Sequence, residues 1–186
     1  MVELELCRAL RAFVEDAVKD LQLPVEPFEE ILDAEEYSEE DAGPEVKPKE
    51  PSPTEEYALR RTPKVFNGYL PYKDEDVEAY GRDFPFIVVR PEEAVSTRDS
   101  TIVTVSLTFG AYSQRTDGYE HCLNMVSRVR IALMSMPFLT LDDRYLLEDG
   151  ITWRAEEDQP NPYWFVVMTT RWIYRSPQPV SGVEDL

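Results

Sequence analysis

Residues from which catalytic and metal sites are usually built are scarce in this sequence. Its 186 residues include one histidine, two cysteines and seven glycines. The glycines are scattered, and no GxxxxGK(S/T), GxGxxG or GxSxG motif is present, which excludes the common phosphate-binding loops and the nucleophile elbow. Cys7 and Cys122 lie far apart without the spacing of a disulfide framework or a zinc knuckle, so reduced thiols are expected.

The single histidine, His121, is the neighbour of Cys122. Adjacent side chains on a helix diverge by about 100°, which disfavours a Cys–His nucleophile pair within this dipeptide. Nothing in the sequence argues for an enzyme. We predict no catalytic residues, no metal site and no cofactor.

Positive charge is scarce as well, because 19 Lys and Arg stand against 37 Asp and Glu, a formal net charge of −18. Proteins that bind nucleic acid by displacing counterions from phosphates need the opposite balance. A surface that lets DNA slide past without holding it is compatible with this charge. The run EEILDAEEYSEED (29–41) is typical of a solvated charge run rather than a metal cage with defined ligand spacing.

Long apolar runs are also missing. No uncharged stretch is long enough to span a bilayer, and charged residues interrupt the start of the chain where a signal peptide would need an apolar core. The sequence therefore predicts a soluble protein that stays inside a cell and does not contact a membrane.

The first part of the chain predicts a helix followed by an acidic linker. Apolar residues recur at spacings of three and four within residues 3–22, and Pro24 follows them. We expect an amphipathic N-terminal helix (residues 1–23) with Leu6, Leu10, Phe13 and Ala17 on its apolar face. Residues 24–62 are rich in acids and proline and predict a tether, with one short helical turn around residues 28–32.

Residues 63–176 predict an α+β domain with a mainly antiparallel sheet packed against a central helix. Expected strands are residues 65–66 before an Asn67-Gly68 turn, 83–91 ending at Pro91, 100–112, 145–154 and 163–175. The expected helix, residues 116–136, begins with a capping box formed by Asp117 and Glu120. Its apolar stripe is Tyr119, Cys122, Val126, Val129, Leu133 and Met136. Residues 177–186 form a C-terminal tail.

The last expected strand, YWFVVMTTRWIYR (163–175), is apolar on both faces. This pattern favours a central strand that is covered on each side, with part of one face available to another subunit as the alternative. A ligand-binding box is disfavoured because, apart from Arg171, few polar groups accompany the aromatic residues.

Four segments within residues 63–175 carry a recognisable series of strand and helix patterns. They are VFNGYLP, DFPFIVVRP, STIVTVSLTFGAYSQRTDGYEHCLNMVSRVRIAL and QPNPYWFVVMTTRWIY. In this order and spacing they resemble the tail-completion or tail-terminator proteins of tailed bacteriophages and prophages. The positions that carry the resemblance are Tyr112, Gly118, Tyr119, Asn124, Arg128, Pro160, Pro162, Tyr163 and Trp164.

The resemblance implies a structural role and no enzymatic activity. Proteins of this kind assemble as a ring, typically a hexamer, at the head-proximal end of the tail. There they end growth of the tail tube and join the tail to the neck or connector. The implied partners are further copies of the chain, the tail-tube protein and a neck/connector protein, and DNA passes through the channel without specific binding. The implied location is the virion, with the host cytoplasm during assembly.

A ring of identical subunits needs heterologous interfaces. We expect the apolar face of the first helix to dock on another subunit or a neck protein. Arg128 and Arg130 either interact favourably with the C-terminal dipole of their own helix or pair with an acidic surface of a neighbouring copy. The candidate interface residues are Leu6, Leu10, Phe13, Ala17, Arg128, Arg130, Trp164, Trp172 and Tyr174.

Three alternatives remain open at this stage. The chain is an acidic adaptor or DNA mimic that binds a basic protein through residues 26–56, an enzyme that uses carboxylates and a divalent metal, or a neck or tube protein at an adjacent level of the tail.

Overall fold

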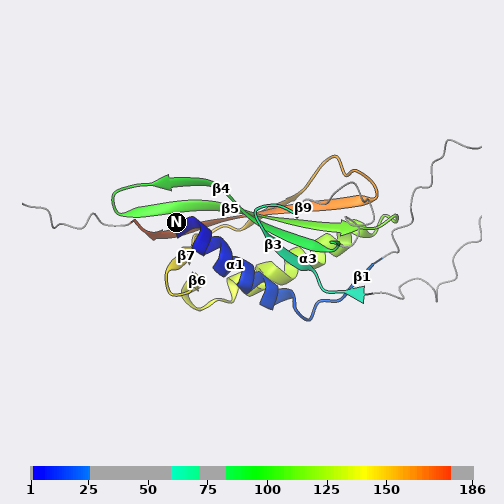
Figure 1. Cartoon of the computed structure of the whole chain (residues 1–186), viewed down its shortest axis with the longest axis horizontal. Coiled ribbons are helices and arrows are strands. Elements are labelled where there is room, and N and C mark those ends of the chain that lie inside the picture. The colour runs from blue at the N-terminus through cyan, green and yellow to red at the C-terminus, as the bar shows by residue number, and fades with distance from the viewer. Residues whose placement is uncertain (1, 26–59, 72–82, 177–186) are drawn as a thin grey trace, which may run out of the picture.

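Both helices pack on one face of a single large sheet, and the opposite face of that sheet carries neither of them (Figure 1). The computed structural model describes residues 2–25, 60–71 and 83–176. Within these residues seven strands form the sheet, in the order β3-β4-β5-β9-β7-β6, and β8 also pairs with β9. Only the β3–β4 pairing is parallel. The predicted α+β class with a mainly antiparallel sheet is therefore confirmed.

The strands differ greatly in length. Those of the sheet are β3 (Lys64–Asn67), β4 (Phe86–Ser96), β5 (Ser100–Tyr112), β6 (Thr140–Leu141), β7 (Tyr145–Leu147), β8 (Thr152–Ala155) and β9 (Tyr163–Arg175). Strands β5 and β9 pair along their whole length, from Ser100 opposite Arg175 to Tyr112 opposite Tyr163. The two clearest strand patterns of the sequence therefore lie side by side at the centre of the sheet.

Strand β5 has the predicted alternation. Every second residue points toward the helices and is fully buried there: Val103, Val105, Leu107 and Phe109. On the same face of β9 the buried apolar residues are Val166, Met168, Trp172 and Tyr174. These side chains form the floor of the main core.

Helix α3 (Gly118–Met134) covers β5 and β9, and helix α1 (Val2–Val18) packs against α3, β3 and β4. The predicted stripe of α3 is confirmed at its four central positions, which are buried: Cys122, Val126, Val129 and Leu133. Tyr119, by contrast, is largely exposed. The predicted capping box is absent, because the Asp117 side chain makes no capping hydrogen bond and instead accepts one from Ser113 Oγ at 3.0 Å.

Helix α1 belongs to the same core as the sheet. Its buried residues follow a strict i, i+4 row with Cys7 beside it: Leu6, Leu10, Val14 and Val18. Phe13 and Ala17 are only partly buried at the flank of this row. Leu6 and Leu10 are covered by their own chain, so these two residues offer no surface to another subunit or a neck protein. Docking through Phe13 and Ala17 stays a prediction.

Two strand boundaries differ from the prediction for identifiable reasons. Pro91 does not end its strand, because a β-bulge between Pro91 and Glu93 accommodates it and β4 continues to Ser96. The single strand expected at residues 145–154 is two strands, β7 and β8, which both pair with β9. Gly150, with φ +101°, lies between them in a conformation that favours glycine.

The two described ends of the predicted linker lie next to each other. Strand β1 (Leu23–Pro24) pairs antiparallel with β2 (Arg60–Arg61), and Gln22 Nε2 donates to Thr62 Oγ1 at 2.8 Å. The described residues on the two sides of segment 26–59 therefore lie next to each other. The expected helical turn at residues 28–32, the acidic run and the C-terminal tail lie outside the described residues.

The packing of α1 leads to a first prediction. Leu10→Ala should lower the free energy of unfolding by about 2–5 kcal/mol, because it empties a site at the centre of the core. Leu4 lies on the same helix and is 45% exposed, so Leu4→Ala should change stability by less than about 0.5 kcal/mol. Urea unfolding of the full-length variants measures both values. Equal effects of the two substitutions would mean that α1 is not part of the core.

Candidate functional site

The face of the sheet opposite the helices is not covered by either of them. Here the alternate residues of β4, β5 and β9 point away from the main core, and several of them are only partly buried. The strand register arranges them in rows that run across the sheet. From one end of this face to the other, the rows change from apolar to polar to aromatic.

An apolar row crosses four strands at one end of this face. Val95 of β4 lies opposite Ile102 of β5, Ile102 lies opposite Ile173 of β9, and Ile173 lies opposite Leu146 of β7. Val95 is 54% exposed and Leu146 is 44% exposed. We call these four residues the strand row. A row of four aliphatic side chains, paired across neighbouring strands and partly exposed, is typical of an interaction site.

The same end of the sheet offers a free strand edge. Strand β3 pairs with β4 only from Phe86 to Val89, so among the described strands the outer half of β4, Glu92–Ser96, pairs with β5 alone. Unpaired backbone groups along such an edge can accept another strand. The turn that follows is held by hydrogen bonds, since Thr97 N donates to Ser100 O at 2.8 Å and Ser176 Oγ donates to Thr97 O at 2.9 Å.

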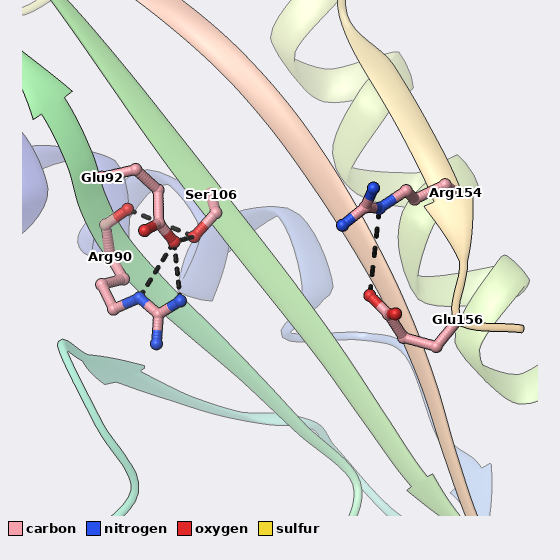
Figure 2. A network of polar contacts seen from close by, with 5 residues as sticks. All are labelled: Arg90, Glu92, Ser106, Arg154 and Glu156. Atoms are coloured by element: carbon pink, nitrogen blue, oxygen red, sulfur yellow. Dashed lines mark hydrogen bonds and ion pairs between the residues drawn. The ribbon is translucent and has the colours of Figure 1, made fainter. Parts of the chain in front are cut away.

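A polar network occupies the middle of this face (Figure 2). The extra residue of the β-bulge, Glu92, accepts hydrogen bonds through Oε1 from Arg90 Nε at 3.0 Å and Nη2 at 2.7 Å, and from Ser106 Oγ at 2.5 Å. On the other side of β9, Arg154 Nε lies 3.9 Å from Glu156 Oε1. The bulge is thus the feature that aims the carboxylate of Glu92 at the neighbouring strand.

These contacts stabilise the charged form of Glu92. The hydrogen bond from Ser106 and then the hydrogen bonds from Arg90 lower the pKa of this carboxyl below its ordinary value, although partial burial opposes the shift. The network therefore keeps the Glu92 carboxylate ionised at neutral pH, where it pairs with the Arg90 guanidinium.

The opposite end of the face is aromatic. Phe84, Phe86, Val88 and Tyr112 form a second buried cluster, with Tyr163 and Phe165 packed against it. The ring centroids of Tyr112 and Tyr163 are 5.6 Å apart. Burial raises the pKa of Tyr163, and the cluster closes this end of the sheet without a helix over it.

A solvent-open groove of about 660 Å³ lies between the aromatic end and the loop that joins β8 to β9. Gln159 braces this loop, because its Nε2 donates to Phe165 O at 2.9 Å while its Oε1 accepts from Phe165 N at 2.7 Å. The groove is lined by Thr108, Arg154, Ala155, Glu156, Glu157, Asp158, Pro160, Phe165 and Val167. Its carboxylates, Glu156, Glu157 and Asp158, are consecutive in the loop, and they are not placed to hold a metal ion.

The structure does not gather the residues predicted for a subunit interface on one surface, and several of them share the main core instead. Trp172 and Tyr174 are buried in their own core. Trp172 Nε1 donates to Thr170 Oγ1 at 2.9 Å, and the Tyr174 hydroxyl donates to Glu3 Oε1 at 2.8 Å. Burial, followed by the bond to Glu3, raises the pKa of Tyr174 to about 12. As with Leu6 and Leu10, these two residues hold the fold together rather than offer a surface.

Trp164 is partly buried at the start of α3. Its Nε1 donates to Ser113 O at 2.9 Å, and a Cβ atom on Gly118 would lie 2.1 Å from Trp164 Cδ1. Glycine is therefore required where this helix begins against the indole. Trp164 is a packing residue at a strand–helix junction.

Arg128 and Arg130 remain on the surface. Both are exposed on α3, and Arg128 Nε donates to Ala17 O at 3.2 Å, near the C-terminus of α1. Arg128 thus interacts with the carboxyl end of the other helix, a position where a cation is favourable. Pairing of Arg130 with a neighbouring copy stays a prediction.

Burial makes both thiols unreactive. It raises the pKa of Cys7 to about 11 and that of Cys122 to about 12. Within residues 2–25, 60–71 and 83–176 no three His, Cys, Asp or Glu side chains are placed to hold a metal ion. None of the described helices is long and apolar enough to cross a membrane.

No protein-family model matches this sequence, and no curated protein matches it at a significant level. The strand row was missed at the level of sequence, although a signal was present. Ile102 and Ile173 interrupt faces of their strands that otherwise carry mainly Thr, Ser or Arg near that end. Their alignment became visible only through the register between four strands.

The polar network generates a second prediction. Because the folded-state pKa of Glu92 is lowered, its stabilising effect is present above the unfolded-state pKa and is lost as the pH falls through the folded-state pKa. Ser106→Ala should therefore move the titration of Glu92, followed by carboxyl NMR, up toward the ordinary glutamate value. Glu92→Gln should make unfolding less dependent on pH in the acid range.

The control for this prediction is Glu157→Gln, which removes one exposed carboxylate from the loop after β8. If Ser106→Ala leaves the titration of Glu92 unchanged, the Ser106 hydroxyl does not stabilise the carboxylate. That result would contradict the assignment.

Proposed function

We propose that this chain is a structural subunit of a bacteriophage tail. In this proposal copies of the chain form a ring at the head-proximal end of the tail, end growth of the tail tube and join the tail to the neck or connector. The observation that carries the proposal is the uncovered sheet face, which combines the strand row with the free edge of β4. A subunit of a ring needs surfaces of this kind, because each copy must contact two neighbours through different parts of its surface.

Several of the positions that resemble phage tail-terminator proteins, among them Gly118, Tyr119 and Trp164, lie at one junction of the structure. Ser113, which follows β5, donates through its backbone N to Pro162 O at 3.0 Å. Trp164 lies against Gly118, and the centroids of Tyr119 and Trp164 are 6.3 Å apart. These contacts join the end of β5, the start of α3 and the start of β9. The resemblance thus supports a shared fold more directly than a shared ring surface.

The charge of the chain is unevenly distributed. The described residues contain 15 basic and 18 acidic residues, a net charge of −3. The remaining −15 of the total of −18 belongs to residues 26–59, 72–82 and 177–186. The proposal that DNA passes through the ring without being held rests on the charge of the whole chain. Binding of a basic protein through residues 26–56 likewise falls outside the described residues.

Capping of tail tubes gives a third prediction. The purified full-length chain, added to polymerising tail-tube protein of the same virus, should bind at one end of each tube and reduce the mean tube length. Electron microscopy measures both effects, and the tube protein alone is the control. Binding along the tube wall would instead favour a protein of an adjacent level, and unchanged tubes without bound protein would reject a terminator.

A further inference from the structure

A second apolar surface lies on the helix layer. Ile131 and Met134 on α3 are each 58% exposed, and Phe138, just after the helix, is 94% exposed. Ile131 and Met134, three positions apart, lie on one side of α3, and Phe138 follows in the turn after the helix. We call these three residues the helix patch. Phe138 has φ 53°, a left-handed conformation that is uncommon for an aromatic residue. Pro137 precedes it and restricts the turn that presents the ring.

The helix patch and the strand row face opposite ways. Helix α3 packs on the sheet through Met125, Val129 and Leu133, so Ile131 and Met134 point away from the sheet. The strand row lies on the other face of the sheet. One two-fold contact cannot bury both surfaces, whereas contact of the row of one copy with the patch of the next buries both in every copy.

The charges beside the two surfaces are complementary. Glu93 lies two positions before Val95, on the same face of β4, opposite Thr104. Arg130 lies on α3 next to Ile131 and is exposed. A row-to-row contact offers Glu93 no basic residue of the helix patch. A row-to-patch contact brings Glu93 near Arg130, which is favourable.

We propose that the strand row of one copy binds the helix patch of a second copy of this chain, with Glu93 beside Arg130 at the rim. The contact is head-to-tail, so repeating it builds a ring or a filament rather than a closed dimer. The proposal deepens the proposed function and rests on it for the choice of a second copy as the occupant. Phe138 is the central anchor, because exposed aromatic residues that become buried contribute most to such contacts.

Two variants of the full-length chain test the proposal by mixing. Val95→Glu with Leu146→Ser removes the strand row, and Ile131→Ser with Phe138→Ser removes the helix patch. Native mass spectrometry over a wide range of concentrations should show oligomers larger than a dimer for the unchanged chain. Each variant alone should be monomeric, with affinity reduced at least about tenfold. An equimolar mixture should form a dimer that does not grow, because only one intact row and one intact patch remain.

The matched control is Leu4→Ser, which changes an exposed leucine outside both surfaces and should assemble like the unchanged chain. Far-ultraviolet circular dichroism should show that all variants are folded, since the substituted side chains are exposed or partly exposed. A charge exchange gives independent evidence. Glu93→Arg and Arg130→Glu should each weaken assembly, and the two together in one chain should restore it.

Several outcomes overturn the proposal. They are a monomeric unchanged chain at every concentration, assembly of either double variant that equals that of the unchanged chain, and growth of the mixture beyond a dimer. Binding of the unchanged chain, but not of the patch variant, to vesicles containing anionic lipid would assign the helix patch to a membrane instead. The capping of tail tubes is measured separately, so the terminator role can survive the loss of this contact, and the contact can survive the loss of that role.

Discussion

The register between β5 and β9 is the constraint on which the rest of the structure depends. Thirteen residue pairs run without interruption from Ser100–Arg175 to Tyr112–Tyr163. The side chains of a strand alternate between faces, so a slip of one residue would turn Val103, Phe109 and Trp172 away from the helices. The same register aligns Ile102 with Ile173 on the opposite face. Core and candidate surface are therefore set together by one pairing.

This dependence explains which parts of the fold could be predicted from the sequence. Strand β5 and the buried stripe of α3 were predictable because each repeats an apolar pattern at its own period. Strand β9 was recognisable by its length and its β-branched and aromatic residues. The parallel pairing of Lys64–Asn67 with Phe86–Val89 had no local signal. The two segments are separated by some twenty residues, and neither segment's own sequence indicates which strand it pairs with.

The errors have equally local causes. Spacings of three and four from Leu10 fit Phe13 and Ala17 as well as Val14 and Val18, and only the packing against β3, β4 and α3 selects the second pair. Pro91 was expected to end a strand, because proline cannot donate to a ladder. It lies instead at a bulge on an edge, where that donor is not needed. Both errors depend on the tertiary neighbours of a residue. The periodicity along one helix or strand carries no information about those neighbours.

The candidate surfaces also could not be predicted from single strands. An apolar residue on a wet face of one strand is common and carries little meaning, so Ile102 alone predicts nothing. Its meaning arises when Val95, Ile173 and Leu146 are brought beside it by three separate pairings. The proposed assembly would have to overcome the repulsion between copies that each carry a net charge of −18. The described residues contribute only −3 of that charge, and salt screens exposed charges over about 10 Å at 0.1 M. This nearly neutral, described part of the chain is therefore well suited to contact another copy.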